Sequence, residues 1–196
     1  WLIDNYVRKE GYLPTSTFHI KVDKDAVRRS GMLLPFGPDS IPDYMEIDLG
    51  GKSSLSKSEM MIYEMLARSH WKRPIYMSVT LGQDNMAGLQ DYLVLEGLAY
   101  RITPFRGSGI QVDVDKMYKN MMTRFRYGNV KADGIYLDET VMRMCQTHRR
   151  MFVCLASELL RNFDVDRATK VLEKCKVELP EKNIPYEEDT ELVRLW

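Results

Sequence analysis

An excess of charge of either sign is missing from this sequence of 196 residues, in which 28 Lys and Arg residues balance 28 Asp and Glu residues. Nucleic-acid binding needs a basic face that neutralises phosphates, so the balance argues against that function. No apolar stretch approaches the roughly 18 residues that cross a bilayer, and no signal peptide is recognisable. The chain begins at Trp1 instead of a methionine. We therefore expect a piece of a longer protein, with any targeting or membrane segments upstream.

Cofactor and metal motifs are also missing. The three cysteines, Cys145, Cys154 and Cys175, have no metal-ligand spacing, and an odd number cannot pair completely within one chain. The sequence contains no G-x-S-x-G, P-loop, H-E-x-x-H or G-x-G-x-x-G motif. These absences lower the expectation of an enzyme. They lead us to predict no catalytic residue, no metal and no cofactor.

The first half of the chain has the patterns of an α/β fold. The expected strands are residues 17–22, 45–49, 75–80 and 99–103. Ser56 and Glu59 have the spacing of a capping box, which predicts a helix over 56–69. Apolar residues from Met86 to Leu93 suggest a further helix that ends at Gly97. Strand, helix and strand then alternate, so we predict a small mixed or mostly parallel sheet with flanking helices.

The second half is expected to be entirely helical. One helix should start near Asp113 or Asp115 and stop near Gly128. Asp138 should cap a longer helix to about Asn162, and Asp164 or Asp166 should cap another that ends before Pro180. The last two match a tetratricopeptide unit, which alternates large and small residues where its helices cross. The matching residues are Phe152, Leu155, Ala156, Leu159, Ala168, Leu172, Cys175 and Pro180. We predict an α/β domain over 1–110 and a helical tail over 111–196. The repeat, at about 149–182, should pack on the first part, and 189–196 could begin another.

Four residues are candidates for binding a ligand. Asp113 and Asp115 form a D-x-D pair, which could hold a divalent metal against a diphosphate. The same residues precede a helix, where carboxylates cap free amides, and this interpretation is favoured. Arg73 and Arg101 could bind a phosphorylated or sugar substrate together with the aspartate pair.

Four segments carry a family resemblance: WKRPIYMSVT (71–80), LQDYLVLEGLAYRITP (89–104), KMYKNMMTRFRYG (116–128) and YLDETVMRMCQTHRRMF (136–152). Together they resemble the soluble C-terminal part of a bacterial family of multi-span membrane proteins, long described as a domain of unknown function. That family is related to the transmembrane protein O-mannosyltransferases of animals. Its members have a C-type glycosyltransferase membrane core and a soluble region that often ends in tetratricopeptide-like helices.

The resemblance implies a partner and a location. The family's catalytic acid and its acidic N-G-D-N-D-T segment lie upstream of the part seen here, so no catalytic residue carries over. The expected function is a non-catalytic accessory domain on the periplasmic side of the inner membrane. It would dock on the membrane-spanning part of the same polypeptide or present an acceptor protein to it. The alternatives are a self-contained α/β enzyme acting on a phosphorylated or sugar substrate, and a helical peptide-binding scaffold.

Overall fold

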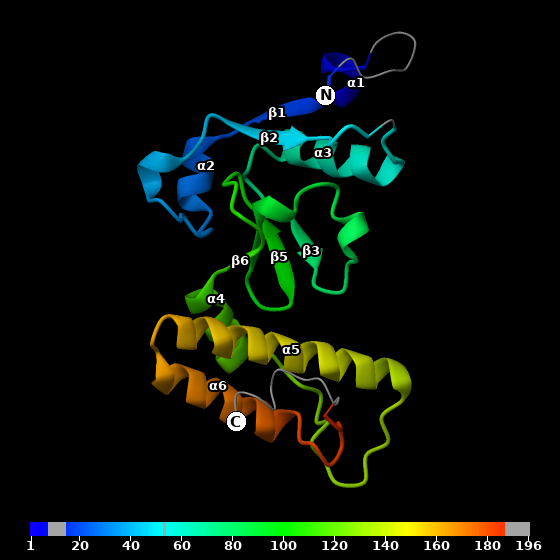
Figure 1. Cartoon of the computed structure of the whole chain (residues 1–196), viewed down its shortest axis with the longest axis vertical. Helices are drawn as coiled ribbons and strands as arrows, with labels where there is room; N and C mark the ends of the chain where they lie inside the picture. The colour runs from blue at the N-terminus through cyan, green and yellow to red at the C-terminus, as the bar shows by residue number, and fades with distance from the viewer. Residues whose placement is uncertain (8–14, 53, 187–196) are drawn as a thin grey trace. The chain divides into compact units, whose positions relative to one another are not determined.

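The computed structural model describes residues 1–7, 15–52 and 54–186 (Figure 1). The chain divides into two compact units. The first comprises residues 1–94 and 99–111, and the second comprises 95–98 and 112–196. Each unit is described by itself. The expected division after residue 110, and the packing of the tail on the first part, stay predictions.

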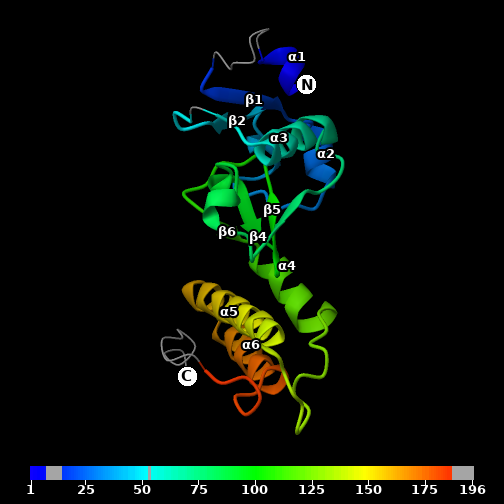
Figure 2. The same cartoon turned by 90° about the vertical axis from the view of Figure 1, so that its right-hand side faces the viewer.

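A two-stranded antiparallel ribbon organises the first unit (Figure 2). Strand β1 (Thr17–Lys21) pairs with β2 (Tyr44–Asp48). Burial alternates along both strands, with Phe18, Ile20, Met45 and Ile47 on the inner face. This alternation is the signature that predicted both strands, and their existence is confirmed. Helix α1 (Leu2–Asn5) precedes the ribbon in the sequence, and helix α2 (Lys24–Arg29) is part of the connection from β1 to β2. The Asp23 carboxylate caps α2 by accepting from the Ala26 amide at 2.9 Å.

Aromatic side chains bond several of the ribbon's outward backbone groups. In an antiparallel pair, alternate residues point their amides and carbonyls away from the partner strand. The Tyr6 hydroxyl accepts from the His19 amide at 3.1 Å and donates to the His19 carbonyl at 3.4 Å. Trp71 donates from Nε1 to the Lys21 carbonyl at 3.1 Å. The Tyr92 hydroxyl donates to the Glu46 carbonyl. At these positions the ribbon's edges are closed to a further strand.

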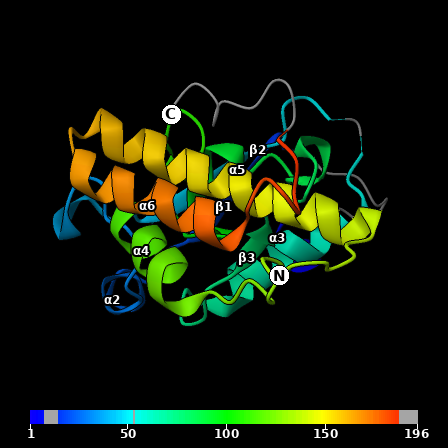
Figure 3. The ribbon, with the colours of Figure 1, turned by 90° about the horizontal axis from the view of Figure 1, so that it is seen from below.

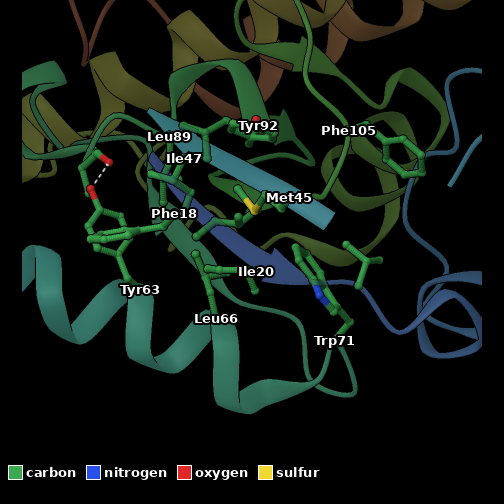
Figure 4. Packing of buried hydrophobic residues seen from close by; sticks show 14 of the residues in the cluster. Phe18, Ile20, Met45, Ile47, Tyr63, Leu66, Trp71, Leu89, Tyr92 and Phe105 are labelled. Atoms are coloured by element: carbon green, nitrogen blue, oxygen red, sulfur yellow. Dashed lines mark hydrogen bonds between the residues drawn. The ribbon is translucent and has the colours of Figure 1, made fainter. Parts of the chain in front are cut away.

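Helix α3 (Lys57–Ser69) covers the inner face of the ribbon, as Figure 4 shows. The predicted capping box is present, with the Glu59 amide donating to the Ser56 hydroxyl and the Ser56 amide donating to the Glu59 carboxylate. Tyr63 and Leu66 point from α3 into the core against Phe18. The buried Tyr63 hydroxyl donates to the Ala87 carbonyl at 2.8 Å, so its polar end is satisfied.

The second sheet has four strands. Its strand order is β3-β5-β4-β6, with β3 at Tyr76–Ser78, β4 at Leu93–Leu95, β5 at Ala99–Ile102 and β6 at Gln111–Val112. Strands β3 and β5 pair antiparallel, as β1 and β2 do, so these two pairs do not follow the mostly parallel arrangement, which was one of the two expected, the other being a mixed sheet.

The expected helix over Met86 to Leu93 is wrong. The segment holds two 3₁₀ turns, Gln83–Asn85 and Gln90–Tyr92, which lead into β4. Ala87 and Gly88 between them have positive φ values of 53° and 69°, which interrupt a right-handed helix. Without a crossover helix before β4 and β5, the argument for parallel pairing no longer holds.

Helices make up most of the second unit. Helix α4 (Val114–Lys119) continues into a single π-helical stretch, Asn120–Arg124. Helix α5 (Glu139–Arg161) and helix α6 (Val165–Glu178) follow and lie side by side (Figures 1 and 3). Aspartates cap all three α-helices, as predicted: Asp113, Asp138 and Asp164 accept the backbone amides of Lys116, Val141 and Arg167.

The α5–α6 pair is a single helical hairpin, and a tetratricopeptide repeat is not shown. Ala156 and Ala168, which were expected at the close crossing, are both buried. A repeat array needs neighbouring units to bury a shared face, and residues 189–196, where another was expected, lie outside the described residues. Helix α5 has 23 residues but carries charged side chains, and none of the described helices is long and apolar enough to cross a membrane.

Candidate functional site

An open groove lies on the first unit, with a volume of about 460 Å³. This volume falls within the range of ligand-binding sites in proteins. Aromatic, proline and charged side chains line it: His19, Phe36, Ser40, Pro42, Tyr44, Glu46, Tyr92, Pro104, Phe105 and Arg106. These residues come from the ribbon and from two loops distant in sequence, so the fold creates the groove.

The outer face of the ribbon provides one wall. His19 and Glu46 are opposite each other in the register, and their side chains form an ion pair at 3.5 Å when the imidazole is protonated. Both are well exposed, so this pair is loose and contributes little to stability. Tyr44 lies two residues from Glu46 along β2, on the same face, and leaves 54% of its surface exposed. The outer face of the ribbon thus presents the Tyr44 ring beside the exposed side chains of His19 and Glu46.

The loop before β2 carries a second exposed aromatic residue. Gly37 has a φ of 86°, which glycine adopts without strain, and a 3₁₀ turn, Pro38–Ser40, follows it. This turn displays Phe36, which leaves 73% of its surface in solvent. A phenylalanine that exposed gains almost nothing from the folded state, because burial is what makes its side chain stabilising.

The opposite wall follows strand β5. Phe105 is buried and belongs to the hydrophobic core of the first unit. The next residue, Arg106, faces Asp91 across 3.5 Å and is mostly exposed. Burial raises the pKa of Tyr92, whose hydroxyl is held on the Glu46 carbonyl. The groove therefore combines the buried aromatic residues Tyr92 and Phe105 with exposed charged side chains of both signs.

Arg73 and Arg101, two of the predicted ligand-binding residues, line a different recess of the first unit. That recess has a volume of about 10 Å³, which is room for roughly one water molecule. Arg101 is 3% exposed and donates from its Nη2 to the Ser30 carbonyl at 3.1 Å. This geometry fits a structural guanidinium. The recess as formed has no space for a phosphate or a sugar ring.

Asp113 and Asp115, the other two, lie at the start of α4. Asp113 accepts the Lys116 amide at 3.0 Å, and its burial raises the pKa of its carboxyl. Asp115 forms an ion pair with Arg167 of α6 at 2.6 Å. Within the part of the chain that the structure describes, no group of three or more His, Cys, Asp and Glu side chains could hold a metal ion. The capping role is observed for Asp113, and the role of the pair in ligand binding stays a prediction.

Sequence reasoning missed the groove residues. The nearest available signals were Phe36 in a loop rich in proline and glycine, and Phe105 directly after Pro104. Aromatic residues outside predicted helices and strands are often surface residues of no function. Nothing in the linear pattern indicated that Phe36, Tyr44 and Phe105 would line one groove.

Comparison with protein families identifies the domain. The sequence model described as TMEM260-associated domain 2 matches residues 3–133. The chain belongs to this family. The match spans all of the first unit except its first two residues, together with α4 and the loop that follows it, so the groove lies within the family domain. Helices α5 and α6 lie beyond the match. No curated protein and no solved structure matches the chain.

The family match confirms an association with membrane proteins of the TMEM260 type. Three of the four segments that carry the resemblance lie within the matched residues, whereas 136–152 lies outside them. The bacterial multi-span parent, its glycosyltransferase core and its relation to O-mannosyltransferases go beyond what this match states.

Proposed function

We propose that this chain is a non-catalytic accessory domain of a membrane-embedded C-type glycosyltransferase, a protein O-mannosyltransferase-like enzyme. The domain stands on the periplasmic side of the inner membrane, binds an acceptor protein through the groove of its first unit and presents it to the membrane core. The α5–α6 hairpin forms a tetratricopeptide-like tail that packs on the first unit and docks on the rest of the parent.

The observation that carries this proposal is the composition of the groove. Phe36 and Tyr44 expose large rings beside Arg106 and Glu46, and such amphipathic, exposed side chains are typical of recognition surfaces. The family match supports the membrane-protein context. By contrast, the two arginines of the rival enzyme hypothesis line a recess too small for its substrate.

The test compares the chain with its parent. The purified chain should transfer no sugar and hydrolyse no lipid-phosphate or nucleotide sugar. Removing it from the parent should impair glycosylation while the membrane core remains inserted. Turnover by the purified chain, lost in Arg73→Ala, Arg101→Ala or Asp113→Asn, would establish the rival enzyme instead. Unchanged glycosylation without the domain would refute the accessory role.

A further inference from the structure

We infer that the groove binds an extended, proline-containing peptide segment with an acidic side chain placed against Arg106. This inference rests on the proposed function for the identity of the polypeptide that supplies the segment. The binding chemistry rests on the groove alone. It names the class of ligand that the exposed aromatic rings and the rim charges fit.

The shape of the groove favours a chain over a small molecule. Small-ligand sites bury most of their ligand's surface in a concave pocket. This groove is open along the ribbon, so a ligand lying in it keeps one side in solvent. A peptide passing across the molecule meets that condition, because only alternate side chains need to contact the protein.

The ribbon's backbone limits how a peptide can bind. A peptide that joins a sheet as an extra strand needs free amides and carbonyls at an edge. The outward groups of His19 are bonded to Tyr6, and the Glu46 carbonyl is bonded to Tyr92. Side-chain recognition is therefore the mode available at these positions.

Aromatic-lined grooves suit polyproline II segments in particular. Such a segment has no internal backbone hydrogen bonds and is already extended before it binds, so ordering it costs little entropy. Proline rings pack flat against aromatic faces, and rigid rings lose few rotamers on binding. Phe36 and Tyr44 offer these faces at the surface, and the buried Phe105 and Tyr92 line the same groove.

The charges at the rim specify the flanking residue. Arg106 pairs with the Asp91 carboxylate at 3.5 Å, and its side chain is 60% exposed. An arginine can bind a second carboxylate with its fork of donors. Glu46, by contrast, already faces the imidazole of His19 at 3.5 Å. An acidic residue beside the prolines is thus complementary to the free side of Arg106.

Fluorescence anisotropy on the 196-residue chain tests the inference with a labelled hexaproline peptide that ends in glutamate. Saturable binding is expected, weakened about tenfold by Phe36→Ala or Tyr44→Ala, as for a recognition residue worth roughly 1.4 kcal/mol. Arg106→Glu should abolish the preference over the same peptide ending in lysine. Phe163→Ala, which removes an even more exposed ring outside the groove, is the matched control and should bind normally.

Two results would overturn the inference. One is no binding of the peptide, or binding that the Phe36 and Tyr44 variants leave unchanged. The other is saturable binding of hexose oligosaccharides, lost in those variants, which would make the groove a carbohydrate site. The same Phe36→Ala change in the parent separates the two proposals. If the peptide binds the chain but glycosylation is unaffected by Phe36→Ala, the groove ligand stands and presentation of the acceptor through the groove fails.

Discussion

Arg149 should be the most costly single residue to remove from the second unit. It lies in α5, is 2% exposed, and within the described part of the chain it bonds the carbonyls of Leu179, Ile184 and Pro185 at 2.9, 2.6 and 3.1 Å. Its guanidinium also lies 4.5 Å from the centre of the Tyr186 ring. One cation thus holds the segment that follows α6.

The cost follows from the carbonyls that would be left behind. A hydrogen bond from a charged donor contributes about 1.5–3 kcal/mol, and breaking a buried charged network typically costs about 3–5 kcal/mol. We expect Arg149→Met to lower the free energy of unfolding by about 3 kcal/mol. For a unit of this size, that loss lowers the melting temperature by on the order of 15 °C. Arg149→Lys should retain only part of this stability, because an ammonium group lacks the planar set of donors of a guanidinium.

Circular dichroism melts and denaturant titration measure this effect, with Arg150→Met as the control. Arg150 is the exposed neighbour on the same helix, so its loss should change stability by less than about 0.5 kcal/mol. Hydrogen exchange should show faster opening of the Ile184 amide, which bonds the Pro180 carbonyl, in the Arg149 variant. Equal melting temperatures for the two variants would refute the stabilising role of the Arg149 hydrogen bonds.

Three further predictions concern helix ends and packing. Hydrogen bonds from the Leu2 amide and then from Arg68 lower the pKa of Glu64 to about 2. The contribution of Glu64 to the free energy of unfolding is therefore full above about pH 4.5 and is lost as the pH falls through 2. In acid titrations of stability, Glu64→Gln should lose this pH dependence. Phe163 sits at φ 59° after α5 and is 92% exposed, so Phe163→Gly should raise stability by about 0.5–1 kcal/mol, and a lower melting temperature would contradict this. Ala168→Arg should cost several kcal/mol by overpacking the α5–α6 seam, and an unchanged melt would mean that the helices do not cross there.

The parts of the fold that the sequence predicted are those determined locally. A capping aspartate or serine acts within three residues of itself, so Ser56 and Asp138 identified their helix starts. Period-two burial likewise depends on the strand itself, and it located β1 and β2. Strand direction depends on a partner elsewhere in the chain, which explains why the antiparallel pairing of β1 with β2 and of β3 with β5 was not predicted.

Other errors came from patterns that two structures share. Apolar residues between Met86 and Leu93 fit a helical period, yet turns and a short buried strand also bury them. Gly88 was the available warning, since it adopts a positive φ there. Strand β6, with only two residues, had no recognisable pattern. The groove required the whole first unit, because the residues that line it become neighbours only after the ribbon and the β5 loop have packed.

Tyr92 links the stability of the ribbon to the geometry of the groove, and its two roles can be separated. Its hydroxyl bonds the Glu46 carbonyl, and its ring lines the groove. Tyr92→Phe keeps the ring but leaves that carbonyl without the hydroxyl, so we expect a loss of about 1–2 kcal/mol in the free energy of unfolding. Peptide binding should stay within about twofold, because the aromatic face remains. Tyr44→Phe, which removes a hydroxyl from a half-exposed ring, should leave stability unchanged and serves as the control. If Tyr92→Phe weakened peptide binding but not stability, the hydroxyl would contact the ligand, and its hydrogen bond to the Glu46 carbonyl would not stabilise the ribbon.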